Sequence, residues 1–116
     1  MKKTVSLKEN HLFRRAYNRG KTAADGRLAL YVRRNGQKSN RLGLTVSTKV
    51  GCAVVRNRIR RRLREIYRLN EDKLISGADV VVVARVRAAT SQYRQLENSF
   101  LKLADKLELL KKEGVK

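Results

Sequence analysis

The residues with the clearest chemistry are the arginines of one short segment. The thirteen residues from Arg56 to Arg68 include seven arginines and a single acid, Glu65. A guanidinium group is planar and weakly hydrated and donates hydrogen bonds in pairs, which suits it to phosphate. Like charges at helical spacing destabilise an isolated helix. Because a solvated helix face usually mixes both signs of charge, this segment indicates a strongly anionic partner.

The spacing within this segment is helical and divides its residues between two faces. An apolar stripe recurs at the i, i+4, i+7 and i+8 positions of Val55, Ile59, Leu63, Ile66 and Tyr67. At about 100° per residue, the opposite face holds Asn57, Arg61, Arg64 and Arg68. The stripe is flanked by Arg56, Arg58, Arg60 and Arg62. We therefore predict a helix that packs its apolar side on the domain and presents guanidinium groups outward.

The overall charge narrows the class of partner. Lys and Arg number 29 against 10 Asp and Glu, so the formal net charge is +19 on 116 residues. Such a charge favours binding to nucleic acid or to an anionic membrane. No apolar run approaches the ~20 residues that span a bilayer, and we expect no signal peptide and no membrane partner. A nucleic-acid-binding protein of the cytoplasm is the expectation.

No set of side chains predicts catalysis by the protein itself. The ten acidic residues are scattered, without the neighbouring carboxylates that a two-metal nuclease needs. His11 is the single histidine and Cys52 the single cysteine, which leaves no zinc ligand set and no internal disulfide. We therefore expect no catalytic residue, no metal site and no bound cofactor in this chain.

Hydrophobic periodicity predicts three helices and about four strands in the order α-β-β-β-α-β-α. Ser6 and Glu9 have the spacing of a capping box, so a first helix is expected from Leu7 to about Asn18, before Gly20. Strands are expected at residues 21–24, 27–34, 41–47 and 78–85, and the last helix at residues 91–113. The apolar run at 78–85 is typical of an interior strand covered on both faces. A single α+β domain, residues 1–116, accounts for this order.

Three aromatic side chains are placed where they could line a groove. Phe13 and Tyr17 are one helical turn apart, and Tyr31 lies on the less apolar face of its strand beside Arg27 and Arg33. If the first helix borders this sheet face, the rings suit unpaired nucleotides, because stacking is worth roughly 1–3 kcal/mol per base. Packing in the core is the alternative for Phe13 and Tyr17, and the sequence leaves both open.

These motifs together resemble the protein subunit of bacterial ribonuclease P. The resemblance covers LKENHLFRRAYNRG at 7–20, LALYV at 28–32, RLGLTVSTKVG at 41–51, AVVRNRIRRRLRE at 53–65 and GADVVVVAR at 77–85. The signature is Arg56-Asn57-Arg58 between a glycine-bearing loop and an Ile/Leu helix. A generic basic helix would not reproduce the strand before it and the valine run after it.

The resemblance implies both a fold and a function. A strand–helix–strand unit is normally right-handed, but the family implies a left-handed crossover around the arginine helix. The implied function is assistance to a catalytic RNA that removes the 5′ leader of precursor tRNA. In the family the RNA performs hydrolysis with Mg²⁺, and the protein aids substrate affinity and metal use. The implied partners are the catalytic RNA and precursor tRNA, with no obligate protein partner.

The resemblance also implies two sets of binding residues. The set facing the catalytic RNA is Arg56, Asn57, Arg58, Arg60, Arg61 and Arg64, with Arg68 on the same outward face. Phe13, Tyr17 and Tyr31 match the aromatic residues of a cleft for the single-stranded leader. Beside them we expect Arg27, Arg33, Ser47 and Lys49 to line this cleft. Tyr17 stands where many relatives carry Phe. Thr48 and Cys52 stand where relatives often have Lys or another polar residue, which weakens any expected phosphate contact there.

Two other functions fit the charge without the resemblance. A ribosomal or general RNA-binding protein would have a structural role, and co-purification with ribosomal subunits would identify it. A DNA-binding protein is the third candidate, and binding to a duplex without single-stranded regions would identify that one. Co-purification with one abundant, leader-cleaving RNA is the outcome expected for a ribonuclease P subunit.

Overall fold

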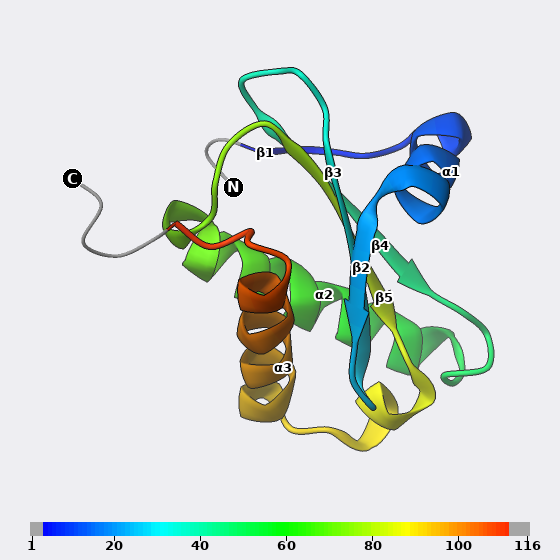
Figure 1. Ribbon diagram of the computed structural model, residues 1–116. Helices are drawn as coiled ribbons and strands as arrows, with labels where there is room; N and C mark the ends of the chain where they lie inside the picture. Colours follow the sequence, from blue (N-terminus) through cyan, green and yellow to red (C-terminus); the bar gives the residue numbers. More distant parts are fainter. Residues whose placement is uncertain (1–3, 112–116) are drawn as a thin grey trace.

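The computed structural model describes residues 4–111 and contains one mixed five-stranded sheet with helices on both faces (Figure 1). The elements in chain order are β1 (Thr4–Ser6), α1 (Asn10–Arg19), β2 (Lys21–Ala24), β3 (Leu28–Arg34), β4 (Asn40–Val46), α2 (Ala53–Asn70), the 3₁₀ helix η1 (Glu71–Lys73), β5 (Ala78–Ala84), the 3₁₀ helix η2 (Val86–Thr90) and α3 (Tyr93–Lys106). The strand order is β1-β4-β5-β3-β2, and α1 lies across the sheet from α2 and α3. The predicted α+β class is confirmed.

The central strand is β5, as its apolar run predicts. It pairs in parallel with β4 and antiparallel with β3. Alternate residues of β5 face the two layers: Val80 and Val82 join the core under α2 and α3, whereas Val81 packs under α1. Because both faces of β5 are covered, valine is favoured at successive positions rather than at alternate ones.

The arginine-rich helix α2 packs its apolar side on the sheet, as the periodicity predicts. Ile59, Leu63, Ile66 and Tyr67 of α2 are buried in the main core with the inward residues of β3, β4 and β5. This core also takes Leu96, Phe100 and Leu103 from α3. Since α2 connects the parallel neighbours β4 and β5, the chain contains the expected strand–helix–strand unit. The left-handed sense of that crossover stays a prediction.

The start of the chain differs from the prediction. Residues Thr4–Ser6 form a fifth strand, β1, parallel to β4, and α1 begins at Asn10 rather than at Leu7. The predicted capping box at Ser6 and Glu9 is wrong, since no side chain caps this helix. The backbone N–H of Leu7 instead donates a hydrogen bond of 2.8 Å to the carbonyl oxygen of Leu42, which continues the pairing of β1 with β4.

Two tertiary contacts explain why the chain forms strand β1 here and does not extend α1 back to Leu7. The hydroxyl groups of Thr4 and Tyr67 share a hydrogen bond of 2.9 Å, which holds β1 against α2. The side chain of Leu7 is buried under α1. Neither contact would form if Leu7 were the first residue of a helix projecting from the sheet.

The last helix is shorter than predicted. Leu96, Phe100, Leu103 and Leu107 are buried along one side of this segment, but α3 ends at Lys106. Glu108 then has a φ of 58°, and the chain turns back so that Leu110 forms a bridge with Leu74. Leu110 is therefore partly buried as extended chain and not as helix. The final predicted helical residues, 112 and 113, lie outside the described residues.

Candidate nucleic-acid interface

The outward face of α2 carries the residues that the periodicity placed there. Asn57, Arg61, Arg64 and Arg68 are all exposed on the side away from the core. Within residues 4–111, no hydrogen bond or ion pair engages the guanidinium groups of Arg61 and Arg64. These two groups are therefore available to an external anion such as phosphate.

Arg68 differs from its two neighbours on this face. Its guanidinium donates to both carboxylate oxygens of Glu65, at 2.7 and 3.3 Å. This hydrogen bonding is the main cause of a lowered pKa at Glu65. Since the charge of Arg68 is shared with a carboxylate, it offers less to an external phosphate than Arg61 or Arg64 does.

The arginines that flank the apolar stripe are oriented by the protein itself. Arg56 donates to the carbonyl of Gly51 at 3.2 Å, and Arg60 donates to the side chain of Asn57 at 3.0 Å. Arg58 reaches the carbonyl of Ala89 at 3.5 Å, and its Nε is buried without a protein partner among the described residues. These contacts limit the rotamers of the signature residues while leaving some of each guanidinium's N–H groups unused.

The predicted aromatic cluster forms across α1 and β3. The rings of Tyr17 and Tyr31 meet edge to face at 4.9 Å between centroids, and Phe13 lies 6.4 Å from Tyr17. The hydroxyl of Tyr17 also shares a hydrogen bond of 2.9 Å with Thr45 of β4. The first helix therefore borders the less apolar face of the sheet, as the groove interpretation requires.

The alternative of core packing also holds in part. Phe13 and Tyr31 are half-buried against a small core of Leu7, Leu12, Ala16 and Val81, whereas Tyr17 is 36 % exposed. Each ring thus has one edge in the protein and part of its surface towards solvent. An aromatic ring held in this way is rigid, and it offers a stacking surface at little entropic cost.

A pocket of about 150 Å³ joins the aromatic cluster to the arginine helix. It lies where β1 ends against β4, and it is lined by Ser6, Leu7, Phe13, Leu42, Leu44, Arg60 and Arg64. Phe13 and Arg64 therefore share one surface, although they are distant in sequence. The periodicity of each segment carries no signal for this contact, which depends on the packing of α1 and α2 around the edge of β4.

The other predicted cleft residues are less closely gathered. The guanidinium of Arg27 donates to Ser91 at 3.1 Å, at the junction of η2 and α3 on the opposite side of the sheet. Ser47 and Lys49 are exposed in the loop between β4 and α2. Of the cationic residues predicted for the cleft, Arg33 is the one on the strand that carries Tyr31.

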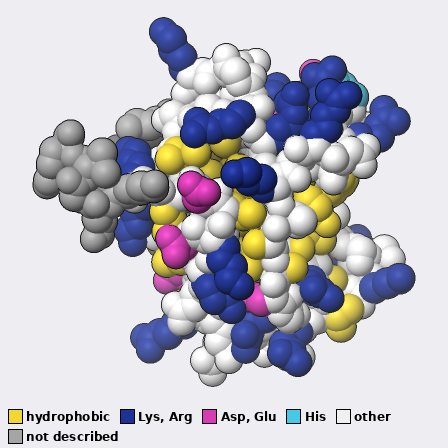
Figure 2. All heavy atoms as spheres, in the orientation of Figure 1, with side chains coloured by type: hydrophobic (Ala, Val, Ile, Leu, Met, Phe, Trp, Pro, Cys, Tyr) yellow, Lys and Arg dark blue, Asp and Glu magenta, His cyan; other side chains and the backbone are white. Residues whose placement is uncertain are grey.

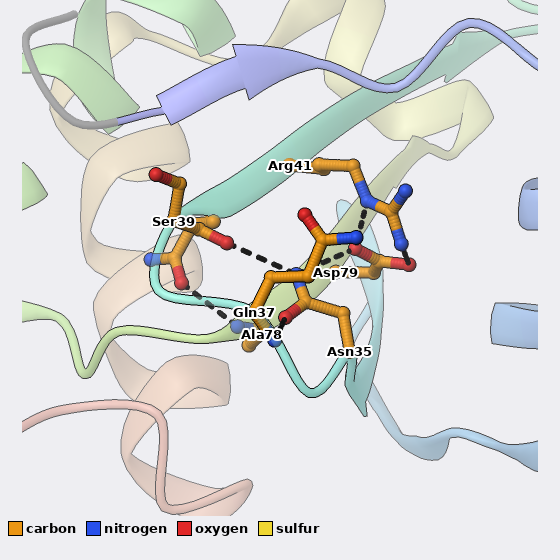
Figure 3. A network of polar contacts seen from close by, with 7 residues as sticks. Asn35, Gln37, Ser39, Arg41, Ala78 and Asp79 are labelled. Atoms are coloured by element: carbon orange, nitrogen blue, oxygen red, sulfur yellow. Dashed lines mark hydrogen bonds and ion pairs between the residues drawn. The ribbon is translucent and has the colours of Figure 1, made fainter.

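A buried carboxylate decides which arginines of this sheet face are available. Arg33, Asp79 and Arg41 are cross-strand neighbours on β3, β5 and β4. Asp79 accepts hydrogen bonds from Arg41 at 2.7 and 3.0 Å and from Asn35 at 3.0 Å (Figure 3). Because Asp79 is only 1 % exposed, its charge must stay paired, and this fixes Arg41 in place. Arg33 has no such partner among the described residues and can meet an external anion.

The rest of the described chain offers no further chemistry of this kind. Cys52 is exposed at the start of α2, where the backbone N–H groups of Val55 and Val54 lower the pKa of its thiol. Within residues 4–111, no group of three or more His, Cys, Asp or Glu side chains is placed to hold a metal ion. Among the same residues, no helix has the length and apolar character needed to cross a bilayer.

Comparison with known proteins decides the family. The sequence model of the family described as Ribonuclease P matches residues 1–108. The chain belongs to the ribonuclease P protein family. It is 40 % identical over 115 residues to the ribonuclease P protein component of Natranaerobius thermophilus, covering 99 % of this chain and all of that protein. It is 44 % identical over 107 residues to that of Clostridium kluyveri, covering 90 % of this chain and 96 % of that one.

Solved structures agree with this assignment. The ribonuclease P protein of Staphylococcus aureus superposes with a TM-score of 0.84 at 30 % identity, over 91 % of this chain and 97 % of that chain. The protein from Thermotoga maritima gives a TM-score of 0.77 at 28 % identity, over 84 % and 92 % of the two chains. As a ribonuclease P protein, the chain is a subunit of a tRNA-processing endoribonuclease, acts in tRNA 5′ maturation and partners the RNA of that enzyme.

Proposed function

We propose that the two surfaces described above divide the work of the subunit. The outward face of α2 binds the catalytic RNA, and the aromatic cluster with Arg33 holds the single-stranded leader of precursor tRNA. The observation that carries this proposal is the exposure of Arg61 and Arg64 without protein partners, on a helix whose apolar side is buried. A cationic face fixed in this way neutralises RNA phosphates without reorganising the protein.

The chemistry of cleavage is assigned to the RNA. The described residues bring together no carboxylate cluster that could hold two metal ions. Near the interface, the hydrogen bond from Arg68 lowers the pKa of Glu65, and backbone N–H groups at the start of α2 lower the pKa of Cys52. The residues at the interface are suited to neutralising charge, which lowers the concentration of Mg²⁺ that the RNA needs to fold and to hold its substrate. The same proposal places the subunit with tRNA precursors in the cytoplasm.

Reconstitution with the cognate catalytic RNA tests this proposal. The protein alone is expected to leave precursor tRNA intact, and to restore cleavage by the RNA at a Mg²⁺ concentration too low for the RNA alone. The measurement is the rate of release of the 5′ leader. Site-specific removal of the leader by protein that is free of RNA and of contaminating nucleases would contradict the assignment of hydrolysis to the RNA.

A further inference from the structure

A cavity at the edge of the sheet borders the surface proposed for the leader and shares Arg33 with it. It has a volume of about 670 Å³ and opens where the sheet edge meets the chain after α3. Its floor is apolar, formed by Val32, Ile75, Leu107 and Leu110. This volume is in the range of pockets that hold a ligand of nucleotide size.

The rim of this cavity is strongly cationic. Five basic residues border it, Arg19, Lys21, Arg33, Arg34 and Lys111, together with one acid, Glu108. Within residues 4–111, the one polar contact of these basic side chains is a long hydrogen bond of 3.5 Å from Arg34 to the carbonyl of Ser76. Figure 2 shows hydrophobic surface between dark blue Lys and Arg side chains on this face of the molecule.

The cavity is present because β2 is shorter than β3 and leaves the end of β3 without a neighbouring strand. The pairing of β2 with β3 stops at Lys21 and Val32, whereas β3 continues to Arg34. Arg33 and Arg34 therefore extend beyond the edge strand, between the end of α1 and the segment that returns after α3. No strand covers this side of their backbone in the described sheet.

The cavity shares Arg33 with the surface proposed for the leader, and its apolar floor belongs to the core on the other face of the sheet. Arg33 lines the cavity and lies two residues after Tyr31 on the same face of β3, about 7 Å along the strand. Arg19 lines it as well, and is two residues after Tyr17 at the end of α1. A chain of nucleotides that runs from the aromatic cluster to the cavity therefore passes Arg33 or Arg19.

We propose that this cavity is a second subsite for the precursor tRNA leader, holding nucleotides that lie further from the cleavage site than those on the aromatic cluster. The apolar floor contacts a base, and Arg33, Arg34 and Lys111 meet the phosphates beside it. This inference rests on the proposed function of the aromatic cluster. An RNA strand fits the combination better than an acidic peptide does, because the apolar floor and cationic rim match a repeating unit of base and phosphate.

A double variant with a matched control tests the subsite in the assembled enzyme. Arg34→Ala with Lys111→Ala removes two cations from the rim, and Arg94→Ala with Lys38→Ala removes the same two residue types from exposed positions outside it. Affinity is measured for a series of precursor tRNAs whose leaders lengthen by one nucleotide at a time. The rim variant should bind long-leader substrates about three- to tenfold more weakly than the control variant does, and should match it for short leaders.

The sole acid of the rim gives a test of opposite sign. Glu108→Gln removes a negative charge from the path of the phosphates, so it should tighten binding of long-leader substrates by about 1.5- to threefold. A photoreactive base placed near the far end of a long leader should crosslink to the segment 107–111, whereas one placed next to the cleavage site should not. Weaker binding by Glu108→Gln, or crosslinks independent of position, would overturn the subsite.

The outcomes separate this inference from the function on which it rests. If leader-dependent binding is present but the rim variant equals its control at every length, the subsite is disproved and the aromatic cluster is unaffected. If wild-type enzyme shows no dependence on the leader at all, the proposed function itself fails. An equal loss for precursor and mature tRNA, or a loss of affinity for the catalytic RNA, would assign the cavity to another part of the RNA and overturn the inference.

Discussion

Phe13 of α1 occupies the space that a side chain at position 43 of β4 would need. A Cβ atom on Gly43 would lie 2.6 Å from Cε1 and 2.7 Å from Cζ of the Phe13 ring, and 3.1 Å from a methyl group of Leu7. The absence of a side chain at this position of β4 is what allows α1 to approach the sheet. The ring that borders the proposed leader surface is thus positioned by a glycine thirty residues later in the chain.

The first prediction follows from this contact. Gly43→Ala should lower the free energy of unfolding by about 1–3 kcal/mol, because the ring and the backbone must move apart in a packed interior. Thermal unfolding checks it. Gly26→Ala is the control, since the atoms nearest to a Cβ there all belong to the flexible side chain of Arg87. Equal stability of the two variants would show that α1 is free to shift.

The second prediction ranks the arginines on the outward face of α2. Arg61→Ala and Arg64→Ala should each weaken binding to the catalytic RNA and reduce the slope of log affinity against log salt by up to ~0.7–0.9. Arg68→Ala should have a smaller effect, because Arg68 is paired with Glu65. Binding titrations across a range of salt concentrations measure all three.

Thermal unfolding of the three variants is the control for this ranking. All three side chains are exposed, so the unfolding temperature should barely change. Glu65→Gln should release Arg68 and tighten binding to the RNA slightly. A larger loss for Arg68→Ala than for Arg61→Ala would show that the RNA breaks the ion pair and uses Arg68 directly.

The third prediction concerns the leader surface. Tyr31→Ala should weaken binding of precursor tRNA to the assembled enzyme by about 1–3 kcal/mol, since a stacked base loses its partner. Affinity for mature tRNA, which has no leader, should stay nearly unchanged. Equilibrium binding of the two RNAs measures the difference, after thermal melting has shown that the variant is folded.

Tyr17→Phe is the matched control for this cluster. It keeps the ring against Tyr31 and removes the hydrogen bond to Thr45, so leader affinity should change little. Truncating Phe13 is less informative, because loss of a buried aromatic side chain can cost ~3–5 kcal/mol of stability. Equal losses for precursor and mature tRNA in folded Tyr31→Ala enzyme would remove Tyr31 from the leader surface.

The fourth prediction is a dependence of stability on pH that comes from Asp25. Burial alone would raise the pKa of this carboxyl, but the N–H groups of Leu28 and Arg27 and the side chains of Ser99 and Lys102 together lower it to about 2. The backbone N–H groups donate to Oδ1 at 2.8 and 2.9 Å, and Lys102 lies 3.4 Å from Oδ2, at the range of an ion pair.

The sign follows from the lower pKa of the folded state. The contribution of Asp25 is fully present above its ordinary value of 3.8 and is lost as the pH falls towards about 2. Its size is about 2 kcal/mol. Urea unfolding of wild type and Asp25→Asn between pH 2 and pH 5 measures it. The variant should show the smaller change across this range, and equal changes would exclude Asp25 as the cause.

The features that lie within single helices and strands could be predicted from the amino-acid sequence. The helical periodicity of α2 fixes which arginines face outward, because side-chain direction repeats every 3.6 residues whatever surrounds the helix. The valine run of β5 likewise fixes its place inside the sheet, since only an interior strand can bury every position. The one-turn spacing of the aromatic pair on α1 and the alternation of apolar residues in β3 could likewise be predicted from the sequence of each element alone.

The contacts between these helices and strands could not be predicted from the sequence, because they depend on the packing of the whole domain. Residues 4–6 pair with β4 because Thr4 hydrogen-bonds to Tyr67 and the strand pairing continues to Leu42. No pattern in so short a segment predicts that partner. The ties of Arg41 to Asp79 and of Arg68 to Glu65 leave Arg33, Arg61 and Arg64 without partners among the described residues. A charge count treats all arginines alike, whereas their availability depends on which carboxylates the fold brings within hydrogen-bonding distance.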